Sequence, residues 1–222
     1  MATAIITGAS GAIGSAIRDE FQSKTNLEIV GLTSSDCDFR DYSATKRFVN
    51  ELDLDNVEVI VLCAGLNNPK SLLETDACLL EQALLTNVIA HKLLLDKFIP
   101  QMVAAQYGRI VAISSLYSTR ARSGRWAYSS SKATQDAMIR SVAVEFGKFS
   151  ILANSVAPGF VDTPLTHKNN SSEDIAKIAE KIPLNRLANR VEIAPIVRFL
   201  ASRENSYITG QNILVDGGMS II

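Results

Sequence analysis

Short apolar runs alternate with longer stretches of helical periodicity along almost the whole chain. The apolar runs predict strands at Ala4–Ile6, Glu28–Leu32, Val57–Leu62, Arg109–Ile113, Ser150–Val156 and Ile213–Val215. Helical spacing of apolar residues predicts helices at Gly14–Ser23, Ser43–Leu52 (with Ser43 as its N-cap), Asp76–Gln101, Tyr128–Phe146, Ser171–Ile182 and Arg190–Ala201. Strand and helix in alternation build βαβ units, so we expect an α/β fold with a parallel sheet covered by helices on both faces.

Composition limits the class of protein. A length of 222 residues suits a single domain, 1–222. Hydrophobic residues at 47% and charged residues at 20% exclude a disordered chain. The formal net charge of -1 lacks the basic excess with which proteins neutralise phosphates, so we expect no nucleic-acid partner.

The cysteines and histidines do not form a metal-ligand pattern. Cys37, Cys63 and Cys78 have no Cys-x-x-Cys spacing, and His91 and His167 stand apart from them in sequence. We therefore expect no metal site, reduced cysteines, and histidines with packing or surface roles.

The N-terminus Met1–Thr7 has no basic segment and only a short apolar run, unlike a signal peptide. No stretch approaches the roughly 18 apolar residues that a transmembrane helix needs. We expect a soluble cytoplasmic protein with no membrane association.

A glycine-rich turn, Thr7–Gly14, joins the first predicted strand to the first predicted helix. Such a turn directs free backbone N–H groups and a helix N-terminus toward one point, which attracts phosphate. A turn of this kind can also occur with no ligand. The phosphate interpretation assigns cofactor contacts to Gly8, Ser10, Ala12, Ile13 and Gly14.

A second set of residues carries acid–base chemistry. Tyr128 and Lys132 share a helix face because they are four residues apart, and Ser115 follows an apolar strand. At ~4 Å and an effective dielectric constant of ~20, a lysine ammonium stabilises a phenolate by about 4 kcal/mol, or roughly three pKa units. Lys132, together with the positive ring of an oxidised nicotinamide, could therefore bring the pKa of Tyr128 near neutrality. Each residue also has a plain alternative: a turn cap, a packed aromatic, a solvated lysine.

The turn, the thirteen-residue separation of Ser115 from Tyr128, and Tyr-x-x-x-Lys together resemble the short-chain dehydrogenase/reductase family. Ala12 stands where the family has its middle glycine, and Leu62-Cys63-Ala64-Gly65 replaces its Asn-Asn-Ala-Gly. The segments Ile182–Leu187, Tyr207–Gln211 and Val215–Gly218 are most similar to the 3-oxoacyl-acyl-carrier-protein reductase branch. The likeness extends from Thr3 to Met219.

This resemblance implies a Rossmann-type doubly wound sheet and an NAD(P)-dependent oxidoreductase that interconverts a carbonyl and a secondary alcohol, with 3-oxoacyl reduction as one candidate. It implies that Tyr128 is the acid/base, that Lys132 lowers its pKa, and that Ser115 donates to the carbonyl oxygen. Asn87 would hold a water that links Lys132 to solvent.

The resemblance also implies further cofactor contacts. They are Ser34, Ser35, Asp38, Phe39, Ala64, Gly65, Asn87, Tyr128, Lys132, Pro158, Gly159, Val161 and Thr163. The second strand is followed by Thr33-Ser34-Ser35 where an acidic residue would select NAD. That favours NADP over NAD, although no Arg or Lys stands there to neutralise a 2′-phosphate.

The substrate would be a small carbonyl or alcohol, with a carrier-linked one among the candidates, and residues 162–182 form a candidate substrate loop. Arg120, Arg122 and Arg125 could meet an anionic substrate or lie in a solvated loop, and Trp126 could line the pocket. The family likeness further implies a homodimer or homotetramer.

Two other functions remain open at this point. The chain could be a non-catalytic, nucleotide-binding regulator or scaffold, although the intact Tyr128 and Lys132 pair argues against that. It could also epimerise or dehydrate a nucleotide sugar, although the short chain leaves little room for a substrate domain.

Overall fold

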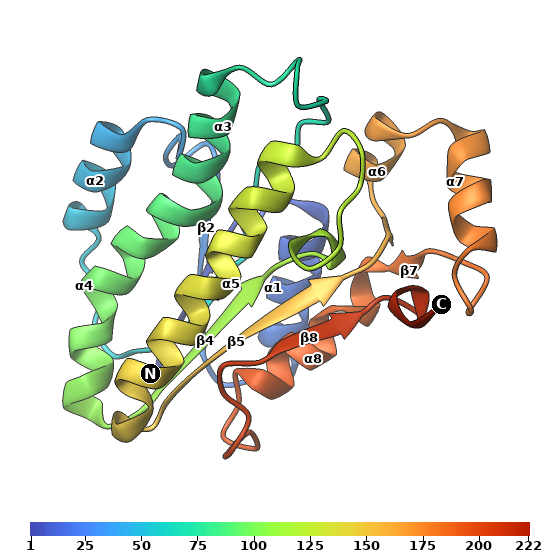
Figure 1. Ribbon diagram of the computed structural model, residues 1–222. Helices are drawn as coiled ribbons and strands as arrows, with labels where there is room; N and C mark the ends of the chain where they lie inside the picture. The colour runs from blue at the N-terminus through green and yellow to red at the C-terminus, as the bar shows by residue number, and fades with distance from the viewer.

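The computed structural model describes residues 1–222, the whole chain. Its centre is a six-stranded parallel sheet in the order β2-β1-β3-β4-β5-β8, with helices on both faces (Figure 1). The strands are β1 Thr3–Thr7, β2 Glu28–Leu32, β3 Val57–Leu62, β4 Gly108–Ile113, β5 Ile151–Pro158 and β8 Asn212–Val215. A separate two-stranded sheet pairs β6 Val161–Asp162 with β7 Ala188–Asn189. The predicted α/β class and doubly wound sheet are confirmed.

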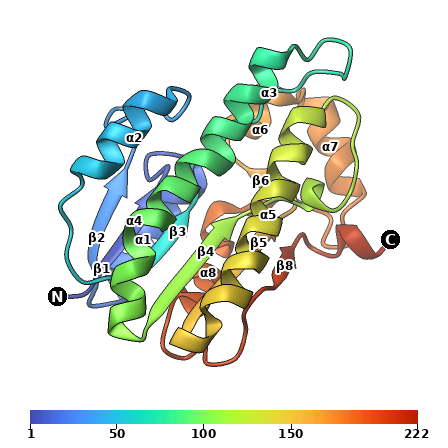
Figure 2. The same cartoon turned by 60° about the vertical axis from the view of Figure 1, so that its left-hand side comes forward.

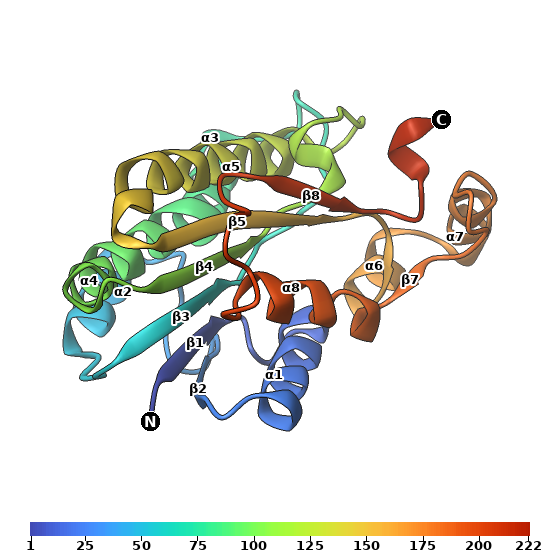
Figure 3. The same cartoon turned by 90° about the horizontal axis from the view of Figure 1, so that it is seen from below.

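Two helical layers cover the sheet. Figure 3 shows α2, α3, α4 and α5 on one face and α1 and α8 on the other. The helices are α1 Ala12–Lys24, α2 Tyr42–Glu51, α3 Ala77–Leu84, α4 Ala90–Ala105, α5 Trp126–Phe146, α6 Pro164–Asn169, α7 Ser172–Glu180 and α8 Ala194–Leu200. The small helices α6 and α7 lie beyond the carboxyl ends of the strands (Figures 1 and 2).

Each central strand is apolar throughout because both of its faces are buried. Ile60 packs in a core with Leu94 and Phe98 of α4, whereas its neighbour Val61 packs in a second core with Ile17 of α1. Successive side chains of a strand point to opposite faces, so one apolar run supplies both cores.

Three local expectations are wrong. Asp41, not Ser43, caps α2, because its carboxylate accepts a hydrogen bond from the Ala44 N–H at 2.9 Å. The predicted helix Asp76–Gln101 is interrupted by a π-helical turn at Leu85–Ile89. The candidate substrate loop, residues 162–182, is not a loop at its start, because it contains α6, which the Thr163 hydroxyl caps.

The helical stretch Ala77–Ala105 is long and apolar enough to span a bilayer by length and composition alone, contrary to the expectation from the sequence. One such helix is weak support for a membrane span, because the core helix of a globular protein passes the same test. Here Leu94, Phe98 and Met102 are fully buried in the sheet's core.

The strand order produces a crevice at one edge of the sheet. The chain passes from β1 to β2 on one side and then crosses to β3 on the other side of β1. The connections after β1 and β3 therefore diverge at their carboxyl ends, which is where open α/β sheets bind ligands.

Candidate functional site

A cavity of about 930 Å³ lies along the carboxyl ends of the strands. Its walls come from the connections that follow β1 to β5 and from α6. Most of the predicted site residues line it: Gly8, Ser10, Ala12, Ile13, Gly14, Ser34, Asp38, Phe39, Ala64, Gly65, Ser115, Tyr128, Lys132, Pro158, Gly159, Val161 and Thr163. Ser35 and Asn87 are not among the lining residues.

The glycine-rich turn is packed too closely for side chains. A Cβ on Gly14 would lie 2.1 Å from the Gly8 carbonyl oxygen, and one on Gly8 would lie 2.8 Å from the Ala64 Cα. Gly8 also has a φ of 65°, a left-handed conformation that favours glycine. The N–H groups of Ala12, Ile13 and Gly14 have no acceptor within the protein, so the N-terminus of α1 can receive an anion.

Thr7 ties the ends of β1 and β3 together. Its hydroxyl oxygen accepts hydrogen bonds from the N–H groups of Cys63 and Ala64, both at 2.9 Å. The same oxygen lies 3.4 Å from Nε2 of His91, which is completely buried under the crevice. Thr7 therefore extends the ladder between β1 and β3 into the turn and helps to fix the turn relative to β3.

Ser115 and Tyr128 meet at the other end of the cavity. Ser115 follows β4, and its Oγ accepts a hydrogen bond from the Tyr117 N–H at 3.1 Å. Tyr128 lies in the first turn of α5. Burial raises the pKa of Tyr128, and the hydrogen bond with the Ser115 side chain and the charge of Arg125 oppose that rise.

Lys132 lies one turn further along α5. Its Nζ donates to the Ile113 carbonyl at 2.6 Å and to Oε1 of Gln135 at 2.9 Å, and it lies 6.0 Å from the centroid of the Tyr128 ring. Burial lowers the pKa of Lys132 to about 8. Gln135 in turn places Nε2 3.1 Å from Nδ1 of His91, so a buried polar chain connects Lys132 with the glycine-rich turn.

The lowering of the Tyr128 pKa by Lys132 together with an oxidised nicotinamide ring stays a prediction. Burial is the largest influence on the Tyr128 pKa and it raises that pKa. Lys132 Nζ lies 6.0 Å from the centroid of the Tyr128 ring and donates hydrogen bonds to the Ile113 carbonyl and to the Gln135 side-chain oxygen.

Asn87 lies behind the cavity wall in the π-helical turn. Its Oδ1 accepts from the Leu66 N–H at 2.6 Å, while its Nδ2 donates to the Leu66 carbonyl at 3.1 Å and to Ser131 Oγ at 2.8 Å. A π-turn redirects side chains and is frequent at functional sites. The side chain holds the segment after β3 in place, and its protein partners leave little capacity for the expected water.

The far end of the cavity contains a basic residue that the sequence analysis missed. Arg40 lines the cavity beside Ser34 and Phe39, and it forms an ion pair with Asp38 at 2.7 Å. Ser35 is exposed and does not line the cavity, and it lies in a turn that hydrogen bonds between Thr33 and Asp36 close.

Some further lining residues have no local sequence signal. They are Leu66, Asn67, Thr86 and Tyr117. Long-range packing brings these residues to the cavity, and no motif marks them.

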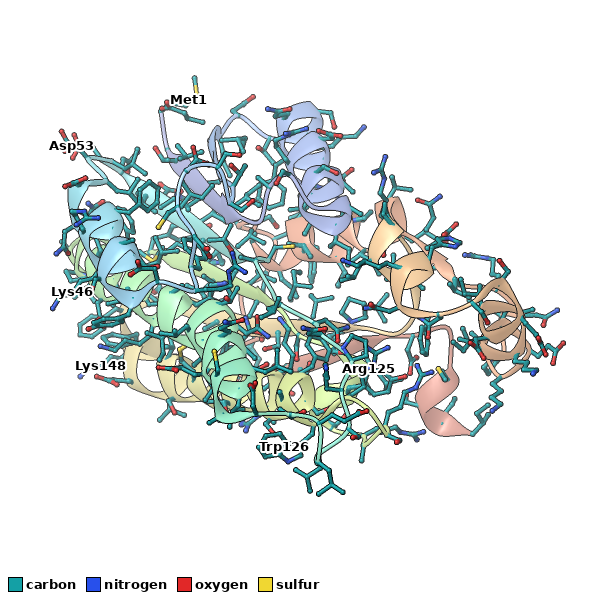
Figure 4. The ribbon with its side chains drawn as sticks, turned by 90° about the horizontal axis from the view of Figure 1, so that it is seen from above. Met1, Lys46, Asp53, Arg125, Trp126 and Lys148 are labelled. Atoms are coloured by element: carbon teal, nitrogen blue, oxygen red, sulfur yellow. The ribbon has the colours of Figure 1, made fainter.

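Two residues at the start of α5 differ from expectation. Arg125 is only 6% exposed and lines the cavity, so the solvated-loop interpretation is wrong for it. Trp126 is 40% exposed and does not line the cavity, which contradicts its expected place in the pocket. Figure 4 shows Arg125 directed inward and Trp126 projecting from the edge of the molecule.

Comparison with known proteins identifies the architecture. A family model described as enoyl-(acyl carrier protein) reductase matches residues 6–220. A 3-oxoacyl-[acyl-carrier-protein] reductase of Aquifex aeolicus is 34% identical over 219 residues, which cover 98% of this chain and 87% of the relative. The chain belongs to the short-chain dehydrogenase/reductase family. The resemblance seen in its motifs is therefore confirmed, and the protein is an NAD(P)-dependent oxidoreductase.

Other short-chain dehydrogenases/reductases have the same fold and different names. Nodulation protein G of Rhizobium meliloti is 31% identical, over 99% of this chain and 97% of its own. A structure from Beutenbergia cavernae, assigned as an NAD(P)-dependent gluconate 5-dehydrogenase and holding NADP at low occupancy, has a TM-score of 0.88 and 28% identity, over 100% of this chain and 97% of its own. Proteins with this fold thus carry different functional names, so the fold alone does not identify a substrate.

The cavity fits a nicotinamide dinucleotide on its own chemistry. Free N–H groups at the start of α1 suit a pyrophosphate. The hydroxyl of Thr86 is buried beside the cavity with no hydrogen-bond partner in the protein, so it is available to a ligand.

Proposed function

We propose that Ser115, Tyr128 and Lys132 carry out the interconversion of a carbonyl and a secondary alcohol in this protein. The main support is that all three side chains line one end of a single cavity, whose other end suits a dinucleotide. The bound nicotinamide cofactor supplies or accepts the hydride.

In the reductive direction, Ser115 Oγ donates a hydrogen bond to the substrate oxygen and stabilises the charge that develops there. The Tyr128 hydroxyl transfers its proton to the same oxygen as the alcohol forms, and in the oxidative direction the phenolate takes that proton back. Ser115 and Tyr128 both line this end of the cavity, so one substrate oxygen can receive both hydroxyl groups.

Lys132 contributes its charge to the same end of the cavity. With its pKa at about 8, the amine is mostly protonated at pH 7 and can stabilise the Tyr128 phenolate electrostatically. It would also hold ribose hydroxyls of the cofactor. Asn87 acts through Leu66 and the backbone around it, as a positioning residue.

We assign the cofactor's phosphates to Gly8–Gly14, its adenosine to Asp38 and Phe39, and its nicotinamide to the segment from Pro158 to Thr163. NADP remains the favoured form, because Ser34 and Arg40 both face the far end of the cavity. The ion pair of Arg40 with Asp38 competes with a 2′-phosphate, so we expect only a moderate preference over NAD.

The names of the relatives make a 3-oxoacyl group, carrier-linked or free, a candidate substrate. We assign residues 162–182 to substrate binding, because several of them form one wall of the cavity. A cytoplasmic location and a homodimer or homotetramer complete the proposal.

Tyr128→Phe tests the mechanism. We expect NADPH binding, measured by fluorescence titration, to be retained, and turnover of a carbonyl panel to fall by about 10²- to 10⁴-fold, the usual contribution of a general acid. Tyr207→Phe, at a fully exposed position, is the matched control. Unchanged turnover in the Tyr128 variant would rule the mechanism out. Cofactor binding with no turnover by the wild type across the panel would instead favour the non-catalytic regulator.

A further inference from the structure

Arg125 is a buried cation at the reactive end of the cavity. It is 6% exposed and immediately precedes α5. The loop around it is fixed by its backbone, because the Lys70 N–H donates to the Gly124 carbonyl at 3.0 Å and Lys70 and Arg125 form an isolated parallel β-bridge. Its guanidinium is therefore held in the wall of the cavity.

Groups of the protein accept a hydrogen bond from only one nitrogen of this guanidinium. Its Nη1 donates to Oδ1 of Asn67 at 3.0 Å, and no carboxylate forms an ion pair with it. The buried Arg109 is different, since its three nitrogens donate to four backbone carbonyls. Arg109 is thus a structural arginine, whereas Arg125 keeps donors for something in the cavity.

The charges around Arg125 are of one sign. Lys132 lines the same end of the cavity, and Arg122 lies 5.1 Å above the Phe160 ring. Burial and the neighbouring Arg122 lower the pKa of Arg125, which is the response of a cation without a counter-ion. The one carboxylate among the lining residues is Asp38, which pairs with Arg40 at the far end.

We propose that Arg125 binds a carboxylate of the substrate, and that the enzyme acts on small oxo acids and the corresponding hydroxy acids. The proposal rests on the proposed carbonyl chemistry. A guanidinium fork matches a carboxylate bidentately, and Arg125 stands one helical turn from Tyr128, so the acid group would lie near the reacting carbon.

Two other anions fit less well. The phosphates of the cofactor have their own donors at the start of α1, on the opposite side of the crevice. The phosphate of a carrier's pantetheine arm is separated from the thioester by a long neutral chain, whereas Arg125 lies beside Tyr128. A carrier-bound substrate presents no carboxylate at this place.

The test compares short 2-oxo and 3-oxo acids with their methyl esters, using NADPH and the intact enzyme. For the wild type we expect higher kcat/KM on the acid of each pair. Arg125→Gln should lower kcat/KM for the acid by about 10- to 150-fold, the range for a hydrogen bond to a charged group, and leave the ester within about threefold. Arg125→Lys, which retains the charge, should recover part of the loss.

Arg203→Gln is the matched control, because Arg203 pairs with Glu58 on the surface and does not line the cavity. Equal losses on acid and ester, or an unchanged preference in Arg125→Gln, would overturn the proposal. Weaker NADPH binding in Arg125→Gln would also overturn it, by assigning the arginine to the cofactor. Turnover of esters that depends on Tyr128 would leave the carbonyl chemistry intact in each of these cases.

Discussion

Protonation of His91 should make the protein less stable in acid. This side chain is fully buried, with Thr7 and Gln135 at its two ring nitrogens. Burial, together with the charge of Lys132, lowers the pKa of His91 from 6.5 to about 3. In the unfolded chain the ring takes up a proton below about pH 6.5, whereas in the folded chain it stays neutral.

The magnitude follows from proton linkage. Below pH 6.5 the unfolded state binds one more proton than the native state at this residue, so the free energy of unfolding falls by about 1.4 kcal/mol per pH unit. Between pH 7.5 and pH 5 the loss from His91 alone is about 2 kcal/mol. The stabilisation is fully present above the unfolded pKa and is lost as the pH approaches 3.

Urea denaturation followed by circular dichroism at pH 7.5 and pH 5 measures this loss at one fixed protein concentration. His91→Gln lowers stability at both pH values, and it should reduce the difference between them by about 2 kcal/mol. His167→Gln, a substitution of the exposed histidine beside Asp162, is the control. A His91→Gln variant that keeps the wild-type difference in unfolding free energy between the two pH values would refute a role for His91 in acid instability.

Three further substitutions have definite expected outcomes. Gly14→Ala places a Cβ 2.1 Å from the Gly8 carbonyl oxygen, and overpacking of about 1–3 kcal/mol should weaken NADPH binding about tenfold or more in a titration; unaltered affinity would contradict the packing of the turn. Gln135→Leu removes one of the two hydrogen-bond acceptors of Lys132, so it should lower both kcat/KM and the urea midpoint, and Gln135→Glu should restore them. Wild-type kinetics in Gln135→Leu would show that the buried hydrogen bonds from Lys132 to His91 are dispensable. Arg109→Met leaves four carbonyl oxygens without their cationic donor and should lower the free energy of unfolding by about 3 kcal/mol. A loss below about 1 kcal/mol would contradict the structural role of Arg109.

Local patterns predicted the framework well. Val57–Leu62 could be identified as a strand because burial on both faces requires a continuous apolar run. The turn at Gly8–Gly14 could be placed because only small residues allow its backbone approach. Tyr128 and Lys132 could be placed on one helix face because helical periodicity requires it.

Helix boundaries were less predictable. Asp41 and Ser43 are both good capping residues, and the backbone conformation before α2 decides between them. The π-helical turn around Asn87 has no sequence signature of its own, because it depends on the pairing of Asn87 with Leu66 across the fold.

The sequence by itself determined the order of strands and helices, the glycine-rich turn and the presence of a Ser, Tyr and Lys set, since each depends on neighbours within a few residues. Only the tertiary structure decided the electrostatics. Whether Arg125 is solvated or buried, whether Arg40 is free or paired, and whether the pKa of Tyr128 rises or falls all depend on which distant segments exclude water from them. Burial and pairing of charges are properties of the packed crossovers, and no local spacing encodes them.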